Sequence, residues 1–241
     1  MRNYTLETEK RVAWIRGQLA SAHAEGIVFG NSGGKDSALV GILCKMACEN
    51  TVGIAMPISK RNFGEDLQDA DEVAEKFAIE KRTIELAEAK DAMLRVLAGA
   101  TTLSDMATAN ISPRLRMITL YAVAASENRL VAGTGNRSEG HMGYFTKWGD
   151  GAYDFNPIAD LTVTEVYEFL RHLGAPEAVI AKAPSAALFD GQTDEQEMGI
   201  TYAAIDDYIL NGVATPEDKA KIDAYHARSE HKRRLPTKYD G

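Results

Sequence analysis

The sequence lacks long apolar runs, has only two cysteines and carries no excess of basic residues. Its 241 residues include 35 Asp and Glu against 27 Lys and Arg, for a formal net charge of −8. This acidic balance offers no general attraction to nucleic acid, so we expect no nucleic-acid partner. The absence of a membrane-length apolar run, and of an apolar core in the segment MRNYTLETEKRVAWIRG, predicts no membrane partner and a cytoplasmic location.

The scarcity of cysteine also excludes the commonest structural metal sites. Cys44 and Cys48 lie four residues apart in a predicted helix, without the paired clusters that a zinc site requires. We interpret them as buried thiols of a protein from a reducing compartment. A composition that is 45% apolar and 26% charged is typical of globular proteins, and the length suits one domain over residues 1–241.

Short apolar runs alternate with amphipathic segments along most of the chain. This alternation predicts an α/β fold, a doubly wound parallel sheet with helices on both faces. The predicted strands are 26–29, 51–58, 83–86 and 129–133. The predicted helices are 5–24, one carrying residues 39–47, 66–77, 87–98, about 103–127, one after a capping box formed by Thr162 and Glu165, 193–210, and a last helix before the basic tail.

Two stretches show no regular period and are therefore candidates for function. Residues 134–157 read TGNRSEGHMGYFTKWGDGAYDFNP and contain five glycines, and residues 183–192 form a second irregular segment.

The stretch NSGGKDS, residues 31–37, follows the apolar run Ile27-Val28-Phe29 and precedes a helix. A strand, a glycine turn and a helix N-terminus together form an anion site, because backbone N–H groups and the helix dipole both face the ligand. The loop matches neither the P-loop nor the dinucleotide-binding glycine pattern. Asp36 beside a phosphate requires a cation, and Mg²⁺ held by carboxylates and phosphate oxygens is the usual solution. Alternatively, Asp36 caps the helix.

The S-G-G-x-D-S pattern after a strand resembles the pyrophosphate loop of the ATP-pyrophosphatase superfamily, whose fold is adenine-nucleotide alpha hydrolase-like (Rossmann-like). Its members activate a carboxylate or carbonyl group by adenylation and release pyrophosphate. This resemblance indicates the superfamily but leaves the substrate open.

Further segments resemble ammonia-dependent NAD synthetases over most of the chain. They are, in order, Asn110-Ile-Ser-Pro-Arg114-Leu-Arg116-Met117, GTGNRSE at 133–139, GYFTKWGDG at 143–151 with Asp154 and Pro157, PSAAL at 184–188, QTDE at 192–195 with Gly199 and Tyr202, and HKR at 231–233. The resemblance implies a homodimeric ligase that joins ammonia to deamido-NAD. ATP activates the nicotinate carboxylate, and the products are NAD, AMP and pyrophosphate.

The resemblance also implies roles for individual residues. The catalytic group is Asp36, Glu139, Lys147 and Asp150, and the Mg²⁺ ligands are Asp36 and Glu139. The ATP-binding residues are Gly30, Asn31, Ser32, Gly33, Gly34, Lys35, Asp36, Ser37, Thr134, Val163 and Ser185. The deamido-NAD-binding residues are Arg114, Tyr121, Lys147, Asp154, His231 and Lys232.

Each of these roles has a plainer alternative. Arg114 can belong to a solvated helix face, Lys147 and Asp154 can pair on the surface, Glu139 can serve the helix dipole, and the basic tail can be solvated. The chain departs from the family at Val163, where a lysine usually contacts an ATP phosphate; Val163 follows the helix cap and need not be a core residue. Lys35, Lys60 or Arg61 can supply the replacement cation.

Two alternatives to NAD synthesis remain open. One is another adenylating enzyme of the superfamily, although tRNA thiolation usually needs reactive cysteines. The other is a non-catalytic nucleotide-binding relative, for which Val163 is the sequence argument. The chain shows no glutamine-hydrolysing segment, so we expect the nitrogen to come as free ammonia or from a separate protein.

Overall fold

The computed structural model describes residues 2–58, 63–181 and 193–239, with the side chains of residues 63–67 outside this description. Its centre is a parallel four-stranded sheet with the order β3-β2-β1-β4. The strands are β1 (Gly26–Gly30), β2 (Thr51–Ala55), β3 (Glu80–Thr83) and β4 (Arg129–Ala132). Strand β1 pairs with both β2 and β4, so it lies at the point where the chain changes direction across the sheet.

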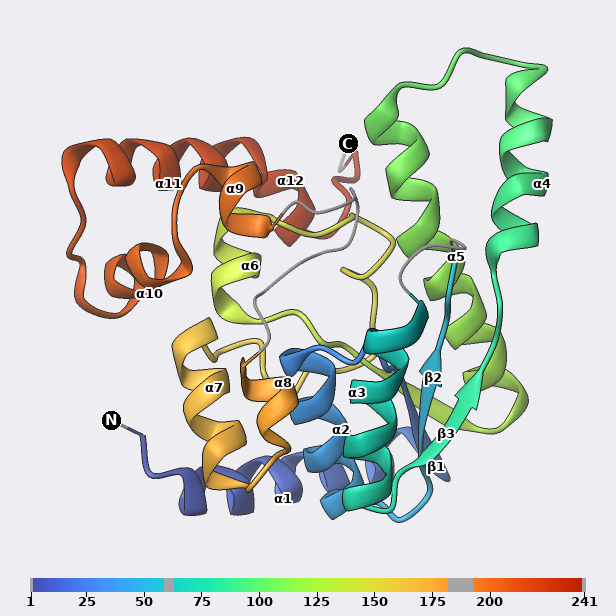
Figure 1. Cartoon of the computed structure of the whole chain (residues 1–241), viewed down its shortest axis with the longest axis vertical. Coiled ribbons are helices and arrows are strands. Elements are labelled where there is room, and N and C mark those ends of the chain that lie inside the picture. The colour runs from blue at the N-terminus through green and yellow to red at the C-terminus, as the bar shows by residue number, and fades with distance from the viewer. Residues whose placement is uncertain (1, 59–62, 182–192, 240–241) are drawn as a thin grey trace.

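Helices cover both faces of the sheet (Figure 1). One face packs against α1 (Tyr4–Ala22), α2 (Lys35–Ala47), α3 (Phe63–Lys76), α7 (Val163–His172) and α8 (Glu177–Ala181), through a core that includes Ile27 and Phe29 of β1. The other face packs against α5 (Asp105–Ser126), to which α4 (Ala87–Ala98) is joined, through Val28 of β1. Successive side chains of a strand point to opposite faces, which explains this division. The predicted doubly wound α/β fold is confirmed.

A third apolar cluster holds the C-terminal half together. It joins α6 (Arg137–Met142), the start of α7, α9 (Asp194–Met198), α10 (Tyr202–Asn211) and α11 (Pro216–Arg228), with Ile205 and Ile222 fully buried. Helix α12 (Glu230–Arg233) follows directly after α11. This cluster fixes α6 beside the end of the sheet; only four residues, 133–136, separate α6 from β4.

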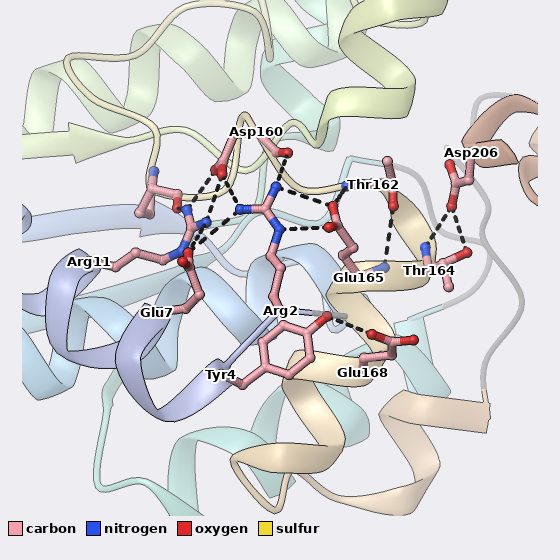
Figure 2. Close-up of polar contacts among 11 residues, drawn as sticks. Arg2, Tyr4, Glu7, Arg11, Asp160, Thr162, Thr164, Glu165, Glu168 and Asp206 are labelled. Carbon is pink, nitrogen blue, oxygen red and sulfur yellow. Dashed lines mark hydrogen bonds and ion pairs between the residues drawn. The ribbon is translucent and has the colours of Figure 1, made fainter. Parts of the chain in front are cut away.

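The N-terminus is attached to α7 by a network of ion pairs that we call the N-terminal clamp: Arg2, Glu7, Arg11, Asp160 and Glu165. Figure 2 shows Arg2 and Arg11 both directed at Asp160, with N–O distances of 2.8 Å and 2.7 Å, while Arg2 Nε also donates to Glu165 at 2.6 Å. The clamp joins residues about 160 positions apart and so fixes α1 against the beginning of α7.

Three boundaries differ from the sequence-based predictions. Strand β3 spans Glu80–Thr83 instead of 83–86, because the paired part of this edge strand is charged while the apolar residues lie beyond it. Strand β2 ends at Ala55 instead of Ile58, two residues before Pro57. The predicted helix 193–210 is two helices, because Gly199 adopts a left-handed conformation with φ 66° and ends α9.

The expectation of no regular structure over 134–157 is wrong for residues 137–142, which form α6. Asn136 and Glu139 make a capping box at its start, and Gly143 ends it with φ 65°. A Cβ at Gly143 would also lie 2.1 Å from Cβ of Ser229, so glycine permits the C-terminal helices to approach here. The capping box predicted for Thr162 and Glu165 is confirmed.

Cys44 is fully buried as expected, whereas Cys48 is only half-buried. Within the described part of the chain, no helix has the length and apolar character needed to cross a membrane.

Candidate active site

The site lies at the carboxyl ends of β1 and β4, where the strand order reverses. In open α/β sheets this switch point leaves a crevice between the loops that follow the two strands, and ligands bind there. The loop after β1 contains Asn31–Gly34 and leads into α2, and the loop after β4 contains Gly133–Asn136 and leads into α6. Two helix N-termini therefore begin at the same place.

The first loop is a tight glycine turn. Gly33 has a φ of 76°, which favours glycine, and Gly34 occupies the N-cap position of α2 without a side-chain cap. The Ser32 and Ser37 hydroxyls lie 3.1 Å apart, and Ser37 Oγ donates to the Gly34 carbonyl at 2.9 Å. Asp36 is the second residue of α2, so the alternative that it caps this helix is wrong.

The side chain of Asp36 instead joins the two loops. Its Oδ2 accepts from Lys35 Nζ at 2.7 Å, and its Oδ1 accepts from Asn136 Nδ2 at 3.1 Å. The backbone N–H of Asn136 donates to Glu139 Oε2 at 3.1 Å, and Asn136 Oδ1 accepts from Glu139 N–H at 3.0 Å. We call Lys35, Asp36, Asn136 and Glu139 the loop carboxylate site.

The loop carboxylate site contains more negative than positive side chains. Burial raises the pKa of Glu139, and the neighbouring Asp36 carboxylate raises it further, against the opposing effect of Lys35. Burial alone would lower the pKa of Lys35, but the charges of Asp36 and Glu139 outweigh it and raise the pKa. Two carboxylates thus share one ammonium group in a region shielded from solvent.

Three further residues beside this site were not among the sequence predictions. Asn136 is 2% exposed, and Asp194 and Tyr202 are 4% and 3% exposed. Tyr202 OH donates to Asp194 at 3.0 Å, and the Asp194 charge contributes to the raised pKa of Glu139. No sequence signal indicated the pairing of Asp194 with Tyr202, because the burial that requires a partner for Asp194 is known only from the fold. The signal for Asn136 was the N-x-x-E capping box.

A second group of predicted residues gathers around the loop 143–151. The Arg114 guanidinium of α5 donates to the Lys147 carbonyl at 3.3 Å, and Lys147 Nζ donates to the His231 carbonyl at 2.7 Å. Lys232 Nζ donates to the carbonyls of Gly143 and Phe145 at 2.8 Å and 2.7 Å. The basic tail is therefore attached to this loop and is not simply solvated.

Tyr121 and Asp154 form another predicted pair. Tyr121 OH donates to Asp154 Oδ1 at 3.3 Å, while Asp154 Oδ2 accepts from the Val131 N–H at 2.7 Å. Burial and then Asp154 raise the pKa of Tyr121 to about 12. Asp154 is thus bonded to Tyr121 and Val131 instead of pairing with Lys147. Asp150 accepts from the Thr146 N–H at 2.9 Å and so closes the turn that carries Lys147.

The remaining predicted site residues lie in different parts of the structure. Gly30 and Thr134 lie at the carboxyl ends of β1 and β4. Val163, whose position after the cap left core burial open, is a core residue, because it is 4% exposed within the third apolar cluster. It is the first residue of α7, and the cap before it directs its side chain inward. Ser185, Lys60 and Arg61 lie outside the described residues.

Comparison with known proteins identifies the family of the chain. The NAD synthase family model matches residues 7–236. An NH₃-dependent NAD⁺ synthetase from Carboxydothermus hydrogenoformans is 48% identical, over 97% of each chain. Among solved structures, NMN synthetase from Francisella tularensis superposes with a TM-score of 0.94 at 38% identity, and NH₃-dependent NAD synthetase from Campylobacter jejuni with 0.82 at 30%, each over 100% of both chains. The chain belongs to the NAD synthase family.

Proposed function

We propose that the chain amidates deamido-NAD with ammonia, using ATP to adenylate the nicotinate carboxylate, and releases NAD, AMP and pyrophosphate. An ionised carboxylate resists nucleophiles, so amide formation at neutral pH requires this activation. The observation that carries the proposal is the loop carboxylate site, in which Asp36 and Glu139 are held by one residue, Asn136, at the switch point of the sheet.

The glycine loop binds the ATP phosphates. Backbone N–H groups at the start of α2 and the hydroxyls of Ser32 and Ser37 supply the donors, and Thr134 lies in the loop that follows β4. Pyrophosphate leaves from this loop while the AMP moiety is transferred to the substrate carboxylate. Ser185 belongs to this set by resemblance alone.

Asp36 and Glu139 fit a Mg²⁺ site. They are hard oxygen ligands in the first turns of α2 and α6, and burial together with the charge of Asp36 raises the pKa of Glu139. Among the described residues no group of three or more His, Cys, Asp or Glu can hold a metal. Two carboxylates are nevertheless the usual protein share for Mg²⁺, which takes its other ligands from substrate phosphates and water. The bound ion would neutralise charge on the triphosphate.

The substrate lies along Arg114, Tyr121, Lys147, Asp154 and His231. The cationic groups of Arg114 and Lys147 face the anionic nucleotide, and Tyr121 supplies an aromatic surface for the nicotinate ring. Lys232 acts on this site indirectly, because its ammonium group holds the two carbonyls of the loop that carries Lys147. Asp150 orders the same loop.

Lys35 is the described residue best placed to replace the lysine missing at position 163. Its ammonium group lies 5.9 Å from the ring centroid of Tyr167, one turn after Val163 on α7, and 5.8 Å from that of Tyr202, which packs with Val163. Val163 itself contributes packing and no phosphate contact. Lys35 thus brings a positive charge from α2 to the start of α7.

The protein is a homodimer that associates through α4 and α5. Helix α4 has no buried residue, and large apolar side chains of both helices are exposed: 40% for Met93, 72% for Val96, 51% for Met106 and 56% for Ile118. Apolar exposure of this kind marks an association surface. Light scattering should give the mass of a dimer, and Val96→Glu combined with Ile118→Glu should give that of a monomer.

A second candidate substrate is nicotinate mononucleotide. The NMN synthetase from Francisella tularensis superposes better than the Campylobacter NAD synthetase, with a TM-score of 0.94 against 0.82. Both reactions amidate the same nicotinate carboxylate, so the catalytic groups would be shared and only recognition of the second nucleotide would differ.

One product assay tests the function and the choice of substrate. Purified protein is incubated with ATP, Mg²⁺ and ammonium, and with either deamido-NAD or nicotinate mononucleotide. We expect AMP, pyrophosphate and NAD, with a higher kcat/KM for deamido-NAD. Formation of ADP and phosphate would contradict adenylation, and preference for the mononucleotide would favour the second candidate. Absence of turnover with both would favour a non-catalytic nucleotide-binding protein.

A further inference from the structure

Lys35 is a buried lysine at the first position of α2, directly after the glycine loop. It is 6% exposed, and its ammonium group is within 2.7 Å of Asp36 Oδ2. Lysine is almost never fully buried unless it is paired. The rings of Tyr167 and Tyr202 lie 5.9 Å and 5.8 Å from the ammonium group, so it is held by one carboxylate and two aromatic faces.

This ion pair engages the carboxylate that the proposed metal site requires. Asp36 Oδ1 is bonded to Asn136, and Asp36 Oδ2 is bonded to Lys35. Each carboxylate oxygen has two lone pairs, but a divalent ion at Oδ2 would lie next to the ammonium group, so the ion binds most favourably when the ammonium group moves away. Both cations would otherwise stand against the same oxygen and repel each other.

We propose that Lys35 is the exchangeable counter-ion of the loop carboxylate site, which occupies Asp36 when no metal is bound and gives it up to Mg²⁺. This inference rests on the proposed function, because it takes Asp36 as a metal ligand. The affinity of the site for Mg²⁺ is then set by competition with the internal ammonium group.

The lysine has somewhere to go when it leaves Asp36. Its four-carbon stem is flexible, and the faces of Tyr167 and Tyr202 keep a favourable site for a cation beside the loop. From there the ammonium group can face an ATP phosphate. One residue thus neutralises the site in the metal-free protein and adds positive charge to the nucleotide site when the ion is present.

The test is Mn²⁺ binding without nucleotide, measured by electron paramagnetic resonance on the full chain. Lys35→Met should bind Mn²⁺ about tenfold to a hundredfold more tightly than the unsubstituted protein, which is the range expected from loss of one competing charge-assisted hydrogen bond. Lys35→Arg keeps the charge and should keep the weaker binding. Lys45→Met, the same change at the other end of α2, is the matched control and should change nothing. Unchanged or weaker binding by Lys35→Met would overturn the inference.

Two further measurements keep the result decisive. If Asp36→Asn binds Mn²⁺ as tightly as the unsubstituted protein, the metal site of the proposed function fails, and this inference with it. If Asp36→Asn loses binding while Lys35→Met is unchanged, only this inference fails. Should Lys35→Met not fold, the ¹⁵Nζ resonance of Lys35 in the intact chain is followed during Mg²⁺ titration. It should shift with the midpoint of ion binding, and a constant resonance would overturn the inference.

Discussion

Helices α6 and α7 begin with the same capping box, yet the glutamates of the two boxes face opposite charges. Asn136 and Glu139 cap α6, and Thr162 and Glu165 cap α7. Burial and the neighbouring Asp36 carboxylate raise the pKa of Glu139, whereas Glu165 is bonded to Arg2 at 2.6 Å in the N-terminal clamp. The same capping box therefore has two roles. The glutamate of α7 is paired with an arginine and stabilises the fold, whereas the glutamate of α6 lies beside a second carboxylate and belongs to the candidate active site.

Substitutions in the two capping boxes should differ most strongly in their effect on kcat. Glu139→Gln and Asp36→Asn should each lower kcat by about 10²–10³-fold, the usual effect of removing one preorganised electrostatic group. Glu165→Gln, the same change in the other box, should leave kcat unchanged. Steady-state kinetics at saturating ATP and Mg²⁺ measures all three.

The folded state provides the control for this comparison. Gln can still complete a capping box, so circular dichroism should give a native spectrum for each variant. Near-normal turnover by Asp36→Asn would mean that Asp36 is only structural. A large loss in Glu165→Gln would mean that the clamp acts on catalysis.

Substitutions of the two N-cap residues, Asn136 and Thr162, should also differ in their effect on kcat, but by a smaller factor. Asn136→Ser keeps an N-cap for α6 but loses the amide that donates to Asp36 at 3.1 Å. Substituting residues that orient metal ligands costs about 10–100-fold in affinity or activity. We therefore expect a fall of this size in kcat, together with a higher Mg²⁺ requirement and little change in Tm.

Thr162→Ser is the matched change in the other box and should leave the kinetics unchanged, with a fall in Tm no larger than the loss of one buried methyl group gives. If Asn136→Ser instead lowers Tm and leaves the Mg²⁺ dependence intact, Asn136 serves only to cap α6.

Stability should move in opposite directions for the two glutamates. Glu139→Gln removes a half-buried negative charge beside the Asp36 carboxylate, so the metal-free protein should unfold at a higher temperature. Glu165→Gln weakens a hydrogen bond between charged groups that is worth about 1.5–3 kcal/mol, and its Tm should fall by about 2–4 °C for each kcal/mol lost. Differential scanning calorimetry in EDTA measures both. A lower Tm for Glu139→Gln would show that its charge is compensated in the fold.

Sequence reasoning succeeded where the information is local. The strand Gly26–Gly30, its glycine turn and the capping box at Thr162 each depend on neighbouring residues, and the structure confirms them. Where long-range contacts decide, the sequence was insufficient. The burial of Lys35 depends on tyrosines of α7 and α10, and that of Val163 on helices up to 60 residues away. The N-terminal clamp joins residues about 160 positions apart and has no local pattern.

Helix α6 was missed for a different reason. Its segment RSEGHM is short, contains a glycine and lies between further glycines, so no apolar period indicates a helix. The capping box at Asn136 was the available signal. The positions of Asp194 and Tyr202 beside Glu139 required the fold, because α9 and α10 reach the site only through the third apolar cluster.

The smallest expected effect is the pH response of the clamp at Asp160. Burial alone would raise the pKa of Asp160, but the hydrogen bond and charge of Arg11, with Arg2, hold it below its usual value. A carboxylate whose pKa is lower in the folded state contributes stability above its unfolded pKa of about 3.9, and this contribution is lost as pH falls through the folded pKa. Asp160→Asn should therefore have the lower Tm at pH 7, and the difference from the unsubstituted protein should shrink below about pH 4. Because the Asp160 side chain is 54% exposed, solvent screening limits the difference to about 1 kcal/mol.

Asp207→Asn, which keeps an acceptor for Asn211, is the control and should show no pH-dependent difference. A difference between Asp160→Asn and the unsubstituted protein that stays constant from pH 7 to about pH 3 would mean that Asp160 stabilises the clamp by shape and hydrogen bonding, and not by its charge.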